Sequence, residues 1–95
     1  MRESKVESHL IKQVKLHGGE TRKCQWLGRR GAPDRYVLWP KRADWVELKK
    51  PKTPHAEDHQ KREHVRLRAA GQLVFLLTSI AEVDQYIEWR SVENG

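Results

Sequence analysis

The sequence has few of the features that cross-link a chain or attach it to a membrane. A single cysteine, Cys24, excludes an internal disulfide and a cysteine-only zinc site. The longest apolar run, residues 73–77, is far shorter than the roughly 20 residues that a transmembrane helix needs. The N-terminal residues lead into no apolar stretch, so we expect no secretory signal. We therefore expect an intracellular protein with no membrane partner.

Composition and charge limit the remaining classes. The 95 residues fit a single domain, residues 1–95, because a second domain would have no room. The chain has 19 Lys+Arg against 13 Asp+Glu, which gives a net charge of +6 and a pI near 9.8. An apolar content of 37% is too high for a disordered tail. A small basic domain remains, and a polyanion is its most natural partner.

The spacing of apolar residues predicts an α-β-β-β-α-β-α order. Val6, Leu10 and Val14 lie on one face of a first helix, which Gly18-Gly19 ends. The predicted strands are residues 20–27, 35–39, 45–49 and 73–78, and we expect the last of them to be buried on both faces. Two more helices are predicted, at 54–70 and from residue 80. A capping box at 79–82 opens the last helix, and Ile80 is expected to face inward. The fold class is α/β, with a four-stranded mixed sheet and flanking helices.

The third strand combines apolar and charged residues in alternation. Val46 and Leu48 share one face, and Glu47 and Lys49 share the other. Asp34, at the start of the adjoining strand, can bring a second carboxylate to the same place. Two carboxylates and a lysine suit a hard divalent cation such as Mg²⁺, and such a site can hydrolyse a phosphodiester.

Spacing alone leaves a simpler interpretation open. Glu-x-Lys is a weak pattern in a chain whose residues are 34% charged. Glu47 and Lys49 then line the solvated face of a hairpin as an ordinary ion pair.

Several motifs taken together resemble a known family. They are Gly-x-Pro-Asp at residues 31–34, Glu-x-Lys at 47–49, and the helical glutamine Gln60. In this combination the chain resembles the VRR-NUC branch of the PD-(D/E)xK nucleases, from Glu7 to about Ile87. The resemblance implies that family's αβββαβ core and a divalent-metal-dependent DNA endonuclease.

The resemblance also implies a set of metal ligands. Asp34 and Glu47 match the family's metal-binding carboxylates, and the main-chain carbonyl of Leu48 is the third oxygen. Glu7, on the first helix, matches a glutamate that reaches the metal directly or through water. The implied cofactor is Mg²⁺, with Mn²⁺ as a substitute.

Catalytic and supporting positions match as well. Lys49 matches the catalytic lysine, and Gln60 matches a glutamine that supports the site or the scissile phosphate. Together with Asp34, Glu47 and Glu7, these residues make up the implied catalytic set.

The expected partner is DNA. Lys23, Arg29 and Arg30 are candidate phosphate contacts, although a solubilising surface explains them almost as well. The resemblance to single-domain members, typical of bacteria and phages, implies a homodimer that cuts branched DNA such as four-way junctions and leaves a 5′-phosphate. A non-catalytic DNA-binding module of the same fold, or a nuclease of ordinary duplex or nicked DNA, stays open as an alternative.

Histidines offer a competing chemistry. His55 and His59 have the i, i+4 spacing that can hold Zn²⁺ on a helix, and His64 follows. The segment lacks the His-Glu-x-x-His pattern of a zinc protease. We expect these imidazoles to face DNA or water instead.

Overall fold

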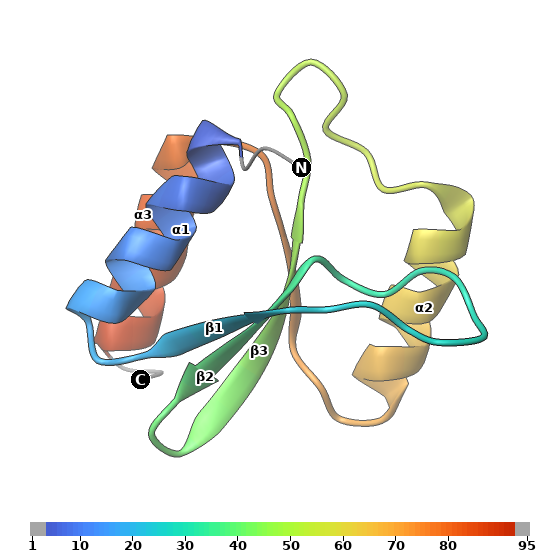
Figure 1. Cartoon of the computed structure of the whole chain (residues 1–95), viewed down its shortest axis with the longest axis horizontal. Coiled ribbons are helices and arrows are strands. Elements are labelled where there is room, and N and C mark those ends of the chain that lie inside the picture. The colour runs from blue at the N-terminus through green and yellow to red at the C-terminus, as the bar shows by residue number, and fades with distance from the viewer. Residues whose placement is uncertain (1–3, 93–95) are drawn as a thin grey trace.

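The computed structural model describes residues 4–92, which form three helices and a four-stranded sheet (Figure 1). The elements are α1 (Lys5–Leu16), β1 (Glu20–Lys23), β2 (Arg35–Trp39), β3 (Arg42–Leu48), α2 (Asp58–Ala69), β4 (Val74–Leu77) and α3 (Ile80–Ser91). This order is the predicted one, and the predicted α/β class is confirmed. Within the described part, no helix is long and apolar enough to cross a membrane.

The sheet is mixed because its last connection differs from the first two. The strands lie in the order β1-β2-β3-β4. β1 pairs with β2, and β2 with β3, in antiparallel fashion. β3 and β4 are parallel, since the chain crosses over through α2 between them.

Helices cover the two faces of the sheet unequally. α1 and α3 pack side by side on one face, and α2 lies on the other (Figure 1). The main core lies under α1 and α3 and consists of Leu10, Val14, Val37, Val46, Leu77, Val83, Tyr86 and Ile87. The face toward α2 carries an aromatic cluster instead, in which Trp45 contacts Trp26 and Tyr36. The apolar core therefore lies on one face, and the other face is left for polar groups.

A buried ion pair joins α3 to the sheet within this core. Asp44 is fully buried on β3 and accepts hydrogen bonds from Nε and Nη2 of Arg90, at 3.0 and 2.5 Å. Tyr86 donates its hydroxyl to the same carboxylate, and Trp39 donates Nε1 to Tyr86 at 3.0 Å. The network satisfies the buried carboxylate and fixes α3 against β2 and β3.

Two element boundaries differ from the predictions. The first strand ends at Lys23 instead of Leu27, because the chain leaves the sheet after Cys24 donates its amide to the Asp34 carbonyl. Leu27 is 93% exposed and lies beyond the end of the strand. The second helix begins at Asp58 instead of Pro54, because Gln60 caps the Glu57 amide with its side-chain oxygen at 2.8 Å.

The remaining differences concern β3, β4 and α3. β3 begins at Arg42, three residues before the predicted start, because Ala43 and Asp44 still pair with β2. β4 is not buried on both faces: Leu76 is 36% exposed, since this strand is an edge of the sheet. Ile80, predicted to face inward, is 40% exposed.

The predicted capping box of α3 forms in part. Ser79 accepts a hydrogen bond from the Glu82 amide at 3.1 Å. The Glu82 carboxylate accepts from the amide and hydroxyl of Thr78 instead of from Ser79.

Candidate active site

Pairing between β2 and β3 brings the two predicted carboxylates together. Tyr36 lies opposite Trp45, and Arg35 lies opposite Val46. Extending this register by one residue places Asp34 opposite Glu47, on the face toward α2 because side chains alternate along a strand. Asp34 and Glu47, which are separated in the sequence, therefore lie close together where β2 begins and β3 ends.

Glu47 occupies a buried and incompletely paired position. Its side chain is only 2% exposed. Gln60 donates Nε2 to Glu47 Oε2 at 3.1 Å, and Lys49 Nζ lies 3.9 Å from the same oxygen. The other oxygen, Oε1, has no hydrogen-bond partner among the described residues. A buried acceptor of this kind costs free energy unless a ligand satisfies it.

Electrostatics around Glu47 oppose its ionisation. Burial and, to a smaller extent, the charge of Asp34 raise the pKa of Glu47 to about 8, against the opposing effect of Lys49. Only a strong positive charge nearby makes the fully ionised pair stable.

Asp34 is held by the backbone of the neighbouring strand. Its Oδ2 accepts a hydrogen bond from the Leu48 amide at 2.7 Å. Since the N–H and C=O of one strand residue point to the same side, the Leu48 carbonyl faces the edge on which Asp34 lies. Two carboxylates and one main-chain carbonyl are thus directed to one end of the sheet.

The first turn of α2 is tied directly to this site. Gln60 accepts from the Glu57 amide with one end of its side chain and donates to Glu47 with the other. The same side chain therefore starts the helix and orients a carboxylate.

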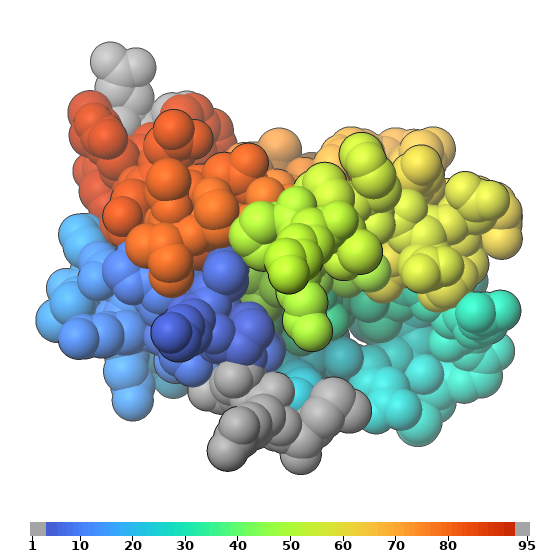
Figure 2. All heavy atoms as spheres, turned by 90° about the horizontal axis from the view of Figure 1, so that it is seen from above, coloured from blue at the N-terminus to red at the C-terminus, as the bar shows by residue number. Residues whose placement is uncertain are grey.

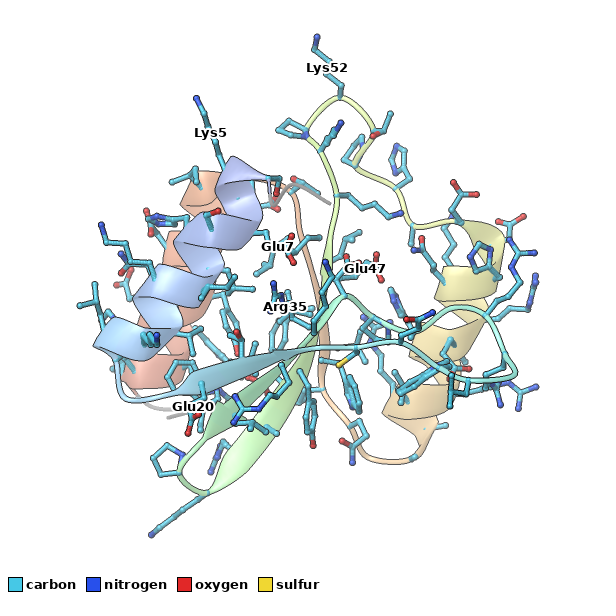
Figure 3. All side chains as sticks on the ribbon, viewed as in Figure 1. Lys5, Glu7, Glu20, Arg35, Glu47 and Lys52 are labelled. Atoms are coloured by element: carbon cyan, nitrogen blue, oxygen red, sulfur yellow. The ribbon has the colours of Figure 1, made fainter. Side chains whose placement is uncertain are left out.

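Glu7 approaches from the opposite side of the sheet. Its Oε2 accepts from Arg35 Nε at 2.8 Å, and Figure 3 shows Glu7 on the side of α1 and Glu47 on the side of α2. Glu7 also lines a groove of about 470 Å³ that includes Asp34 and Lys49 in its walls. Its predicted contact with a metal stays a prediction.

The predicted DNA contacts separate into two places. Lys23 is exposed on the edge strand β1. Arg29 and Arg30 lie in the loop between β1 and β2, beside α2, where Arg29 donates Nη2 to Glu63 at 2.8 Å.

The histidines behave differently from one another. His55 lies before α2 begins, so His55 and His59 do not share a helical face. His64 was expected to face DNA or water, and that expectation is wrong: it is buried, with Nε2 3.6 Å from Glu47 Oε1. Burial lowers the pKa of His64, and the charge of Arg68 lowers it further. Its i+4 spacing from Gln60 was the available sequence signal, since both then face the sheet.

The donor set fits a hard divalent cation. No three His, Cys, Asp or Glu side chains converge within residues 4–92, so the site is not a ready-made cluster of side chains. The available donors are instead the oxygens of Asp34, Glu47 and Leu48. Mg²⁺ takes one or two carboxylates and completes its shell with water and substrate oxygens. The unpartnered Oε1 of Glu47 is an acceptor that such an ion would satisfy.

Comparison with known proteins identifies the family to which this chain belongs. No protein-family model matches the sequence. A solved structure described as a VRR_NUC domain aligns with a TM-score of 0.83 at 38% sequence identity, over 87% of this chain and 90% of that one. The chain belongs to the VRR-NUC family, as its motifs predict.

A viral relative supports the same assignment. The protein named "Putative nuclease p44" of Acyrthosiphon pisum secondary endosymbiont phage 1 is 42% identical over 83 residues. The alignment covers 83% of this chain and 85% of the phage protein, so the likeness extends through the fold.

Proposed function

We propose that this protein is a divalent-metal-dependent endonuclease that hydrolyses phosphodiester bonds in DNA. The observation that carries the proposal is the pairing of Asp34 with a buried, incompletely satisfied Glu47 beside Lys49. A hairpin that only exposed its charges to water would not bury a carboxylate there. Membership of the VRR-NUC family and the name of the phage relative support the same activity.

Asp34, Glu47 and the Leu48 carbonyl would hold the ion, with Mg²⁺ as the natural cofactor and Mn²⁺ as a substitute. When bound, the ion supplies Lewis-acid chemistry that stabilises negative charge on the phosphate.

The side chains of the protein supply the other parts of the reaction. Lys49 orients the attacking water and stabilises charge that develops on the phosphate. Gln60 fixes the rotamer of Glu47 through its hydrogen bond. Attack on phosphorus with the 3′-oxygen as leaving group gives a 5′-phosphate and a 3′-hydroxyl.

The groove lined by Glu7, Asp34 and Lys49 is the proposed entry for the scissile strand. Lys5 and Lys50 also line it, and both carry the charge that attracts a phosphate backbone. We propose branched DNA as the preferred substrate and a homodimer as the active form. A dimer offers two sites to two strands of a junction, and light scattering at micromolar concentration tests it.

Cleavage assays test the proposal directly. Labelled four-way junction, flap and linear duplex are incubated with the protein in Mg²⁺, Mn²⁺ or EDTA, beside Glu47→Ala and Lys49→Ala. We expect metal-dependent cutting by the wild type, strongest on the junction, and none by either variant.

Other outcomes point to the alternatives. Binding without metal-dependent cleavage would leave a DNA-binding module of the same fold. Equal cutting of all three substrates would indicate a nuclease of ordinary duplex. Cutting that survives both substitutions would place the active site elsewhere.

A further inference from the structure

A second positively charged hollow lies on α2, apart from the carboxylate site. It has a volume of about 310 Å³ and is lined by Arg29, Arg30, His59, Arg62, Glu63 and Arg66, which we call the arginine pocket. Its residues come from the β1–β2 loop and from α2, segments about 30 positions apart in the chain. Figure 2 shows the loop and α2 side by side at one end of the molecule. The fold therefore gathers these charges from two separate segments.

The pocket is a built feature of the fold. Arg29 and Glu63 hold the loop to the helix through their 2.8 Å ion pair. Gly31 has a φ of +101°, and a Cβ there would lie 2.7 Å from the His59 carbonyl oxygen. Only glycine allows the loop to pack so closely on α2. The walls of the pocket are thus fixed against each other.

Charge in the arginine pocket is unbalanced. Four guanidinium groups surround it, and Glu63 is the single carboxylate of its lining. No side chain among residues 4–92 forms a hydrogen bond or ion pair with the guanidinium groups of Arg30, Arg62 or Arg66. Like charges gathered around one hollow repel each other, so the arrangement favours an anion there. Guanidinium groups bind phosphate in bidentate fashion, which lysines cannot.

Helix α2 contributes residues to both the carboxylate site and the arginine pocket. Gln60 faces Glu47, whereas His59, Arg62 and Arg66 lie along an adjacent stripe toward the loop. From Gln60 to Arg66 the helix rises about 9 Å. Since His59, beside Gln60, also lines the pocket, the pocket and the carboxylate site are neighbours along these two turns of the helix.

We propose that the arginine pocket binds a backbone phosphate of DNA close to the one that is cut. The inference rests on the proposed nuclease function and deepens it, because the pocket would hold the strand in register with Glu47. Any backbone phosphate satisfies the pocket, so it adds affinity without base sequence preference.

Metal-free binding separates the pocket from catalysis. The pair Arg62→Gln and Arg66→Gln is combined in one variant, and a control combines Lys12→Gln and Lys15→Gln, which remove the same charge from exposed positions of α1 across the sheet. Affinity for a labelled four-way junction is measured in EDTA by fluorescence anisotropy over a range of salt. Circular dichroism confirms that each variant is folded.

We expect the arginine variant to bind on the order of tenfold more weakly, with a salt slope smaller by about 1–2, because each phosphate contact contributes about 0.9. The control keeps the wild-type slope. Free inorganic phosphate at millimolar concentration should compete with DNA for the wild type and less so for the arginine variant.

Each result has a definite meaning. An unchanged slope in the arginine variant, or an equal loss in the control, overturns the pocket. If the wild type binds through these arginines but does not cut with Mg²⁺ present, the pocket stands and the nuclease function fails. If the wild type cuts and the arginine variant binds unchanged, the function stands and the pocket fails.

Discussion

Glu47 brings together the opposing demands of stability and function. Gln60 satisfies one of its oxygens, and the other has no hydrogen-bond partner among residues 4–92. The pKa of Glu47, raised to about 8, means that the metal-free protein prefers this side chain protonated at neutral pH. A cation in the site would remove that preference, so the position is arranged for a ligand more than for the free protein.

The pH dependence of stability follows from this pKa. Between the ordinary value of 4.5 and about 8, the folded protein keeps a proton that the unfolded chain releases. The unfolded state then binds fewer protons, so stability falls as pH rises through this window. Glu47→Gln has no such loss, and in EDTA at pH 8 it should be more stable than the wild type by about 1–3 kcal/mol.

Urea unfolding at pH 4.5 and pH 8 measures this difference. The two proteins should be of similar stability at the lower pH and diverge at the higher one. A difference that is the same at both pH values would contradict the buried titration of Glu47.

Lys49 should matter for the reaction and little for the fold. Its side chain is partly exposed, and its ammonium lies 3.9 Å from Glu47 Oε2. Lys49→Met should lower kcat by about 10²–10³-fold through loss of transition-state charge stabilisation. Metal-free DNA affinity should change only a few-fold. A variant that loses affinity as strongly as activity would assign Lys49 to binding instead.

At the scale of elements, α2 and the loop before β2 contribute most of the polar groups on the face of the sheet opposite the main core. α2 has few apolar contacts with the sheet, and its inward residues include Gln60, Glu63 and His64. Because α2 packs mainly through polar contacts, its position depends on how closely the neighbouring loop approaches it. Gly31 supplies that geometry where the loop meets the helix.

Two glycine substitutions separate backbone strain from packing. Gly31→Ala would add a Cβ 2.7 Å from a main-chain oxygen at a φ of +101°, whereas Gly28→Ala meets open space at a φ of +79°. We expect a cost of about 1 kcal/mol for Gly28→Ala and about 2–4 kcal/mol for Gly31→Ala, measured by thermal unfolding. Equal costs would mean that the loop moves away from α2 without penalty.

Across the whole molecule, the sheet separates the apolar core from the candidate active site. The apolar core and the Asp44–Arg90 pair lie under α1 and α3, and the carboxylate site lies toward α2. Stability thus rests mainly on one face. The other face can keep an unpaired acceptor and a cluster of arginines without unfolding the domain.

The buried pair gives a test of this division. Arg90→Met leaves the fully buried Asp44 without its cation, and we expect a loss of about 3–5 kcal/mol. Replacing Asp44 as well, by Leu in the same chain, should recover part of that loss. Chemical unfolding measures both; a small effect of Arg90→Met would show that Tyr86 alone satisfies the carboxylate.

Some features of the fold could be predicted from the sequence, and others could not. The element order, the β2 strand and the faces of Val46 and Glu47 followed from apolar periodicity, which is local. The late start of α2 did not, because the side chain of Gln60 caps the helix at Glu57 and the predicted start at residue 54 is not used. The end of β1 was misplaced because an alternating pattern continued where no strand partner remained.

The sequence by itself determined the class of the fold and the residue types available for a metal site, since both depend on spacing along the chain. It could not determine that His64 faces Glu47, that Arg35 pairs with Glu7, or that Arg29 and Arg66 line one hollow. These contacts join residues across the sheet register and across α2 packing. Only the tertiary structure decided them, because burial and charge proximity depend on distances that chain order does not contain.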